Sequence, residues 1–393
     1  MLLSACLLCA VLDGYDVAII SYVTPEIARE WSVPLSTFGW VFSAGLLGLV
    51  LGALALAPAA DRYGRRAIML VAVSGAVAAT AGNALVGNLV HLILSRIAVG
   101  LTVGAMTALV VAIAFEVAPM RVRVLMVTIV GCGFSLGNLL CGVLASAVIP
   151  VWGWRVLFYG AAAALLLVGI LFFQFLGNSA RIADRGTGSD IAGIRSLFRP
   201  GRRGLTASVW LLHFGGVGAL YMIMSWMPSL LTRSGYTTAH AAFAVAFVSA
   251  GGLVGSVIGG LLLNSIGKAW LLINYAIAGV SMIALPLFFG SWLIFPLNVV
   301  VGFSVVGGYI CNNVVAADVY PSELRASGVG WAQGVGRTSS VVSPLLVSLA
   351  LQLDATNAQI LLIGTAFTVM SAAAILLLLL RARGETLRQR QAA

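Results

Sequence analysis

The chain alternates between long apolar stretches and short polar or glycine-containing turns. Each apolar stretch is close to the ~20 residues that an α-helix needs to cross the hydrocarbon of a bilayer. The pattern therefore predicts an all-α polytopic membrane protein with twelve transmembrane helices. These are expected near residues 2–24, 36–58, 67–86, 89–114, 124–148, 155–176, 205–231, 239–262, 269–288, 291–315, 327–351 and 357–380.

Composition points to the same class. Hydrophobic residues make up 61% of the 393 residues, charged residues make up 9%, and the mean hydropathy is +1.07. A soluble domain carries about 25% charged residues, so a soluble enzyme of this length is excluded. The N-terminus is interpreted as the first span and not as a signal peptide, because it lacks a basic segment and Asp13 and Asp16 interrupt its apolar run.

Basic residues orient the predicted spans, because cytoplasmic loops of membrane proteins are enriched in Lys and Arg. Most of the 22 basic residues fall on one side, namely Arg62, Arg65, Arg66, Arg121, Arg123, Arg181, Arg185, Arg195, Arg199, Arg202, Arg203, Lys268, Arg325, Arg381, Arg383, Arg388 and Arg390. Only Arg29, Arg155 and Arg233 fall on the other side. Both termini are therefore expected in the cytoplasm. This topology accounts for the net charge of +10, so no nucleic acid is expected as a partner.

One polar segment divides the chain. Residues 177–204 are rich in Arg and Gly and contain Pro200. We expect an N-terminal six-helix bundle at 1–176, a cytoplasmic central loop at 177–204, a C-terminal six-helix bundle at 205–380 and a cytoplasmic tail at 381–393.

The two halves contain an internal repeat. The segment from Glu116 to Arg123 reappears from Asp318 to Arg325, and the segment 96–100 reappears at 298–302, both at an offset of 202 residues. The segment 61–65 reappears at 264–268, at an offset of 203. Three matches at nearly one offset indicate a duplication, which is typical of secondary transporters.

The halves differ in their charges. Asp61 and Arg96 correspond to Asn264 and Asn298 in the second half, and the segment Asp13-Gly-Tyr-Asp16 corresponds to a run without charge at 215–218. An ion-coupling site is therefore expected mainly in the first half.

Several motifs resemble a known superfamily. Asp61-Arg-Tyr-Gly64-Arg65-Arg66, Arg96-xxx-Gly100-xxx-Gly104 and Gly133-Phe-Ser-Leu-Gly137 resemble loop and helix motifs of the major facilitator superfamily. Asp13-Gly-Tyr-Asp16, and Tyr320-Pro-Ser-Glu-Leu-Arg325 with the following Gly336-Arg337, are similar to the aromatic acid:proton symporters within it.

The resemblance implies a fold and an activity. The fold would be two pseudo-symmetric six-helix bundles around a central cavity, with transport by alternating access. The activity would be symport of a small aromatic carboxylate with protons into the cell. Only one of the 22 basic residues is Lys, which indicates a high-GC coding bias, so the membrane is expected to be a bacterial cytoplasmic (inner) membrane. The family's aspartates in the first span are implicated in transport, and Asp61, Arg96 and Glu116 match its functional positions.

Ionisable residues at membrane depth are costly and usually functional. Asp13 and Asp16 are three residues apart and share a helix face. Asp13 lies roughly 20 Å from the cytoplasmic end of its span, and Arg96 lies roughly 10 Å from the outer end of its own. In a core of about 30 Å these depths nearly coincide, so Arg96 is expected to pair with these aspartates.

Opposing influences on such a carboxylate suit proton coupling. Burial and a second acid favour the protonated form, whereas a guanidinium favours the ionised form. Asp13 and Asp16 are therefore predicted to carry the proton. The alternative interpretation is a purely structural clamp between the aspartates and Arg96.

A second set of charges lies at the cytoplasmic helix ends. Asp61, Arg65, Glu116 and Arg123 are predicted to form a salt-bridge latch, with Gly64 in the intervening turn. Asp318 and Arg325 are the corresponding residues of the second half, where Asn264 breaks the loop motif. The alternative is that these are solvated charges at helix ends, which contribute little.

Substrate contacts are expected from one more cation and from aromatic rings. Arg96 and Arg337 are candidates to hold a carboxylate, and the alternative for Arg337 is a pairing with Asp318 or with backbone carbonyls. Aromatic residues that permit ring stacking include Tyr15, Tyr309 and Trp331. His213 is interpreted as a packing residue and not as a proton relay.

Rival functions remain. On the same fold, the chain could carry another organic anion or act as a drug or metabolite efflux antiporter. A membrane-bound enzyme would need a catalytic constellation, and the three scattered histidines offer none. A sensor would usually add a soluble signalling domain. The five cysteines are interpreted as small apolar residues, so no metal or cofactor is expected, and the chain is expected to act as a monomer in the lipid bilayer.

Overall fold

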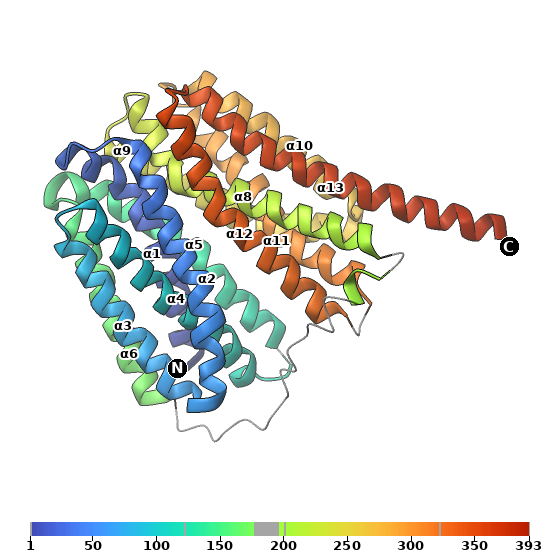
Figure 1. Ribbon diagram of the computed structural model, residues 1–393, viewed down its shortest axis with the longest axis horizontal. Coiled ribbons are helices and arrows are strands. Elements are labelled where there is room, and N and C mark those ends of the chain that lie inside the picture. The colour runs from blue at the N-terminus through green and yellow to red at the C-terminus, as the bar shows by residue number, and fades with distance from the viewer. Residues whose placement is uncertain (1, 122, 177–195, 200–201, 322–323, 393) are drawn as a thin grey trace. The chain divides into compact units, whose positions relative to one another are not determined.

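The computed structural model describes residues 2–121, 123–176, 196–199, 202–321 and 324–392. Figure 1 follows the helices of these residues along the chain. The first half contains α1 (Leu2–Glu30), a 3-10 turn η1 (Leu35–Thr37), α2 (Phe38–Tyr63), α3 (Arg65–Leu85), α4 (Leu89–Val117), α5 (Arg123–Trp152) and α6 (Arg155–Phe175). The second half contains α8 (Arg203–Arg233), α9 (Thr238–Ile266), α10 (Ala269–Ala284), a 3-10 turn η2 (Leu285–Phe288), α11 (Ile294–Val319), α12 (Arg325–Gln352) and α13 (Asn357–Ala392).

Within these described ranges, twelve helical segments are long and apolar enough to cross a membrane. This confirms the prediction of twelve spans, each within a few residues of its expected position. The two largest differences are at helix ends: α1 continues past residue 24 to Glu30, and α13 continues past residue 380 to Ala392.

Both differences have a local cause. Pro25 lies inside α1 without ending it, because membrane helices tolerate a proline when neighbouring groups satisfy the freed backbone. The helix ends instead before Ser32, whose φ of 54° is left-handed. The last turns of α13 are rich in Arg, Glu, Leu and Gln and contain no proline. These are good helix formers, so the helix continues after the apolar run ends.

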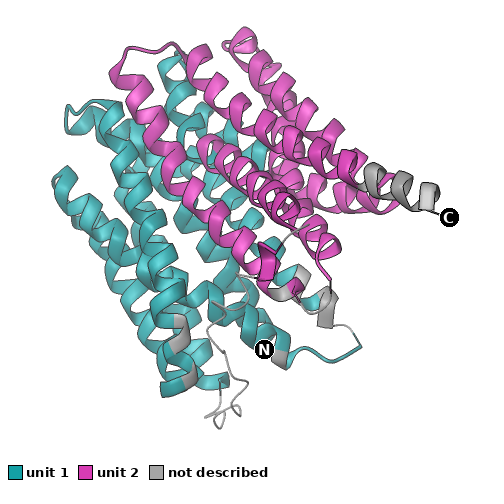
Figure 2. Cartoon of the chain, turned by 45° about the vertical axis from the view of Figure 1, so that its right-hand side comes forward, with its two compact units in different colours: residues 1–185, 224–249 teal, residues 186–223, 250–393 magenta. Residues whose placement is uncertain are grey.

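The chain forms two compact units (Figure 2). Unit 1 consists of residues 1–185 and 224–249, and unit 2 consists of residues 186–223 and 250–393. In unit 1, α1 packs on α5, α2 on α4, and α3 on both α4 and α6. In unit 2, α10 packs on α11 and α13, and α11 packs on α12. Each unit has its own apolar core.

Glycines allow the closest helix contacts. A Cβ atom on Gly137 of α5 would lie 1.8 Å from the carbonyl oxygen of Val11, and one on Gly14 of α1 would lie 1.9 Å from that of Phe134. The α2–α4 contact is similar, because a Cβ on Gly52 would lie 2.0 Å from the carbonyl oxygen of Leu101. Small residues at these positions let the backbones touch, which is how membrane helices gain packing energy without a hydrophobic driving force.

The same contact recurs in unit 2, as the internal repeat predicts. A Cβ on Gly255 of α9 would lie 2.3 Å from the carbonyl oxygen of Phe303 on α11. Gly255 follows Gly52 by 203 residues, the offset of the repeated loop motif. The glycines of that motif both have a positive φ, +91° at Gly64 and +76° at Gly267. Glycine adopts positive φ at little cost, so both loops use a glycine at the same position of the motif.

Candidate functional site

Asp16 on α1 and Arg96 on α4 form a buried ion pair. The two terminal guanidinium nitrogens of Arg96 lie 3.3 Å from Oδ1 and 3.2 Å from Oδ2 of Asp16. One of them also lies 3.3 Å from the backbone oxygen of Asp16. Each side chain is only 5% exposed. The pairing of Arg96 with the first span, expected from depth alone, is therefore present, and Asp16 is the aspartate that makes it.

The packing around this pair explains its position. Gly14 and Gly137 hold α1 against α5, so the neighbouring helix face, with Asp13 and Asp16, is directed toward α4. Gly45 on α2 lies next to the guanidinium, and a Cβ there would be in ordinary van der Waals contact with it, 3.4 Å from Nε of Arg96. The position of the Asp–Arg pair thus follows from the contacts of Gly14 and Gly137, which touch neither Asp16 nor Arg96.

Asp13 also contacts α4, but through a different group. The hydroxyl of Thr107 lies 2.9 Å from Oδ2 of Asp13 and donates a hydrogen bond to it. The same hydroxyl lies 2.9 Å from the backbone oxygen of Val103. The two aspartates of the first span therefore meet a guanidinium and a hydroxyl, two groups with different chemistry.

Tyr15 is buried on α1 with 7% of its surface exposed. It lies near Cys141 on α5, and its backbone nitrogen is close to Gly137. Tyr15 therefore belongs to the α1–α5 contact of unit 1.

The remaining predicted substrate residues belong to unit 2. Arg337 on α12 is partly exposed and lies near enough to Tyr309 on α11 to act on it electrostatically. Trp331 is 40% exposed and stacks on Trp210 of α8, with ring centroids 6.4 Å apart and planes inclined by 30°. His213 lies 3.0 Å from the backbone oxygen of Val209 and 3.4 Å from Asn313. These contacts are those of a buried packing histidine.

The loop charges are only partly described. The side chains of Asp61, Glu116 and Arg123 lie outside the described residues. Gly64 ends α2 and Arg65 begins α3. In unit 2, Lys268 Nζ lies 3.0 Å from Oδ2 of Asp318, and Arg325 is exposed at the start of α12. Asp318, considered from sequence as a partner of Arg337, thus pairs with Lys268.

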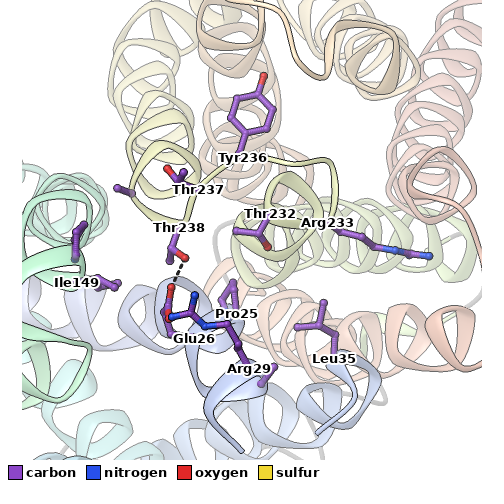
Figure 3. Close-up of a pocket in the computed structure, with 13 residues that line it drawn as sticks. Pro25, Glu26, Arg29, Leu35, Ile149, Thr232, Arg233, Tyr236, Thr237 and Thr238 are labelled. Carbon is purple, nitrogen blue, oxygen red and sulfur yellow. Dashed lines mark hydrogen bonds and ion pairs between the residues drawn. The ribbon is translucent and has the colours of Figure 1, made fainter. Parts of the chain in front are cut away.

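A cavity of about 740 Å³ lies where α1 ends, among the ends of α5, α8 and α9 that belong to unit 1. The hydroxyl of Thr238 on α9 donates a hydrogen bond to Glu26 of α1, as the dashed line in Figure 3 marks. Glu26 also pairs with Arg29. The described lining of this cavity contains none of the residues predicted to bind substrate or protons.

A family model described as the Major Facilitator Superfamily matches residues 6–344 of the chain. The chain belongs to the Major Facilitator Superfamily. Members of this superfamily are membrane transporters, so the chain is an integral membrane transporter and not an enzyme. Its fold is accordingly the major facilitator fold, with twelve transmembrane helices in two pseudo-symmetric six-helix bundles.

Individual superfamily members resemble the chain over most of its length. It is 31% identical to the gallate transporter of Pseudomonas putida, over 90% of this chain and 86% of that protein. It is also 31% identical to the 4-hydroxybenzoate transporter of Pseudomonas putida, over 86% of this chain and 83% of that protein. Among solved structures, a bacterial homologue of the human lysosomal transporter Spinster matches with a TM-score of 0.79 and 17% identity, covering 97% of this chain and 96% of that one.

Sequence reasoning missed one residue of this superfamily member's site, Thr107. It follows Arg96 by eleven residues, which is about three turns of an α-helix, so the two side chains share a face of α4. That spacing was the available signal. A lone threonine in a membrane helix usually bonds its own backbone, and only the packing of α1 on α4 identifies Asp13 as its second partner.

Proposed function

We propose that this transporter imports a small aromatic carboxylate together with a proton. Two relatives named for gallate and 4-hydroxybenzoate, both aromatic carboxylates, support the substrate class. The buried pair of Asp16 and Arg96, with Asp13 three residues away on the same helix, supports the coupling. A proton carrier needs acids inside the membrane that can reach both the ionised and the protonated form during each transport cycle.

The proposal assigns roles to the residues described above. Asp13 and Asp16 are the proton-coupling residues. Arg337 is proposed to bind the substrate carboxylate, because the guanidinium of Arg96 already holds Asp16. Arg96 then acts on substrate only when its pair with Asp16 opens. Tyr15, Tyr309 and Trp331 are proposed to offer ring faces to the aromatic substrate.

The conformational change is proposed to be a motion of the two duplicated halves. The halves 1–176 and 205–380 would rock against each other, joined by 177–204. The Lys268–Asp318 pair supports an inner latch, since these residues correspond to Arg65 and Glu116 in the repeat. Asp61, Gly64, Arg123 and Arg325 are proposed as further parts of that latch. One chain contains both halves, and we propose that it works as a monomer.

The test is uptake of labelled aromatic acids into proteoliposomes that contain the purified protein. Gallate, 4-hydroxybenzoate and benzoate are compared with cyclohexanecarboxylate, a matched acid without an aromatic ring. We expect at least one aromatic acid to accumulate when the lumen is more alkaline than the outside. We expect no accumulation when a protonophore collapses the gradient, and only the slower passive accumulation of the membrane-permeant neutral acid in vesicles without protein.

The two parts of the proposal fail separately. Equal uptake of cyclohexanecarboxylate would contradict the aromatic substrate class. Accumulation that ignores the gradient would contradict proton coupling, and accumulation driven only by the reverse gradient would indicate an antiporter.

A further inference from the structure

The two aspartates of α1 differ in what their partners on α4 can do. Arg96 presents a guanidinium, which only donates hydrogen bonds and keeps its proton in proteins. Asp16 is bound by two of its nitrogens at 3.2 and 3.3 Å, with both side chains 5% exposed. Protonating Asp16 would leave a buried guanidinium without a counter-charge, which is strongly unfavourable. The contacts of Arg96 therefore favour the ionised form of Asp16.

Thr107 is different because its hydroxyl can both donate and accept. It carries one hydrogen and has two acceptors at 2.9 Å, namely Oδ2 of Asp13 and the backbone oxygen of Val103. When Asp13 is ionised, the hydroxyl donates to the carboxylate. When Asp13 is protonated, the acid donates to the hydroxyl oxygen, and the hydroxyl hydrogen turns to Val103. Both protonation states are hydrogen-bonded after a rotation about one side-chain bond.

We propose that Thr107 is a positioning residue that makes Asp13 the proton-carrying member of the two aspartates, while Asp16 stays ionised against Arg96. The inference rests on the proton coupling of the proposed function and narrows it to one carboxyl. The proton comes from water on one side of the membrane, resides on Asp13 and leaves to water on the other side. Among the described residues, the titratable groups near the two aspartates include Cys9 and Tyr15 on α1, Arg96 on α4 and Cys141 on α5.

The first readout is labelling by dicyclohexylcarbodiimide, which modifies protonated carboxyls in apolar surroundings and needs no transport. The full-length protein in liposomes is labelled across a pH series, and the modified residue is identified by peptide mass spectrometry. We expect labelling at Asp13 that declines as the pH rises, and little labelling at Asp16. Labelling of Asp16 in place of Asp13, or of neither residue, would overturn the inference.

The variants test the hydroxyl itself. Thr107→Val removes a hydrogen bond that is stronger to the ionised than to the protonated carboxyl, because bonds to a charged acceptor are the stronger ones. Asp13 should therefore stay protonated to higher pH in this variant. Thr107→Ser keeps the hydroxyl and should follow the wild-type profile. Thr102→Val is the matched control, because Thr102 lies on the same helix and its hydroxyl bonds only backbone oxygens, those of Ala98 and Val99. A Thr107→Val profile that matches the control contradicts the role of Thr107.

The second readout separates this inference from the proposed function. Gradient-driven uptake is measured in the same liposomes, alongside exchange of labelled for unlabelled substrate without a gradient. In Thr107→Val, the external pH at which uptake declines should rise together with the pH at which labelling of Asp13 declines. Exchange of labelled for unlabelled substrate should be retained. If wild type shows the expected labelling but no gradient-driven uptake, the proposed coupling is wrong and the assignment of the protonated carboxyl to Asp13 stands.

Discussion

The Asp16–Arg96 pair shows how a single residue acts through its surroundings. Two buried charges cost desolvation energy that their mutual attraction offsets only when the geometry is good. Here both terminal guanidinium nitrogens reach the carboxylate, and one also reaches a backbone oxygen. Removing one partner leaves the other charge buried and unpaired, whereas removing both leaves two neutral groups. Comparing the single variants with the double variant therefore distinguishes a structural role of the pair from a role in transport.

The first prediction uses that difference. Arg96→Gln alone should destabilise the protein by about 3–5 kcal/mol, because Asp16 loses its counter-charge in a buried site. The double variant Asp16→Asn with Arg96→Gln should recover most of that stability but should not transport. Stability is measured as thermal denaturation in detergent, and transport as uptake into proteoliposomes.

The matched control is Arg155→Gln. Arg155 also pairs with an α1 carboxylate, that of Glu30, but both of these side chains are 42% exposed. Exposed pairs contribute little, so stability and uptake should stay near wild type. If the double variant of Asp16 and Arg96 transports normally, the pair is a structural clamp.

At the scale of the helices, glycine contacts set the distances and rotations on which the charges depend. The α1–α5 contact brings backbone against backbone at Gly14 and Gly137, and the α2–α4 contact does the same at Gly52. A side chain inserted at such a point meets a carbonyl oxygen, and a backbone cannot move aside as a flexible side chain can. The charged site should therefore be sensitive to substitutions that never touch it.

The second prediction concerns Gly137→Ala. The new Cβ would lie 1.8 Å from the carbonyl oxygen of Val11, so α1 and α5 must separate. We expect a loss of about 1–3 kcal/mol in stability, typical of overpacking, and reduced uptake because Asp13 and Asp16 move with α1. The control is Gly131→Ala on the same helix, where a Cβ would meet no atom within 4 Å. A Gly137→Ala protein as stable as the control would contradict this close contact.

At the scale of the whole chain, the distribution of basic residues predicts the orientation in the membrane. Most of them lie in loops or at helix ends that the twelve spans place on one side, and such basic segments stay in the cytoplasm. We propose that both termini and the central loop are cytoplasmic, in the inner membrane of a bacterium.

The third prediction tests this orientation with single epitope tags in otherwise unchanged proteins. A tag after Ala393 and a tag at Gly188 should be inaccessible to antibody in intact spheroplasts and accessible after permeabilisation. A tag at Gly87, in the turn between α3 and α4, should be accessible in both, because one span separates it from the cytoplasmic side. A Cβ at Gly87 would meet no atom within 4 Å, so the turn has room for an insertion. Labelling of the first two positions from outside intact cells would reverse the topology.

Local patterns were enough to predict much of this protein. Apolar runs of helical length gave the twelve spans, because crossing a bilayer imposes the same length on every helix. The repeat offset paired Gly64 with Gly267, and both have a positive φ. The depths of Asp13 and Arg96 along their spans anticipated that Arg96 pairs with the aspartates of the first span, because depth follows from residue count at a fixed rise per residue. The ends of α1 and α13 were missed, because neither Pro25 nor the end of the apolar run stops a helix by itself.

Only the tertiary structure decided the partners around each helix. Counting residues along one helix does not tell how that helix is rotated relative to its neighbour. Asp13 and Asp16 lie on the same helix face, so their spacing alone does not decide which of them meets Arg96. The contacts of α1 with α5 and α4 select Asp16 for the guanidinium and Asp13 for Thr107. Likewise Asp318 pairs with Lys268, although its sequence position suited Arg337 as well. Hydropathy and spacing act within one helix, whereas a hydrogen bond between two helices depends on how their backbones approach.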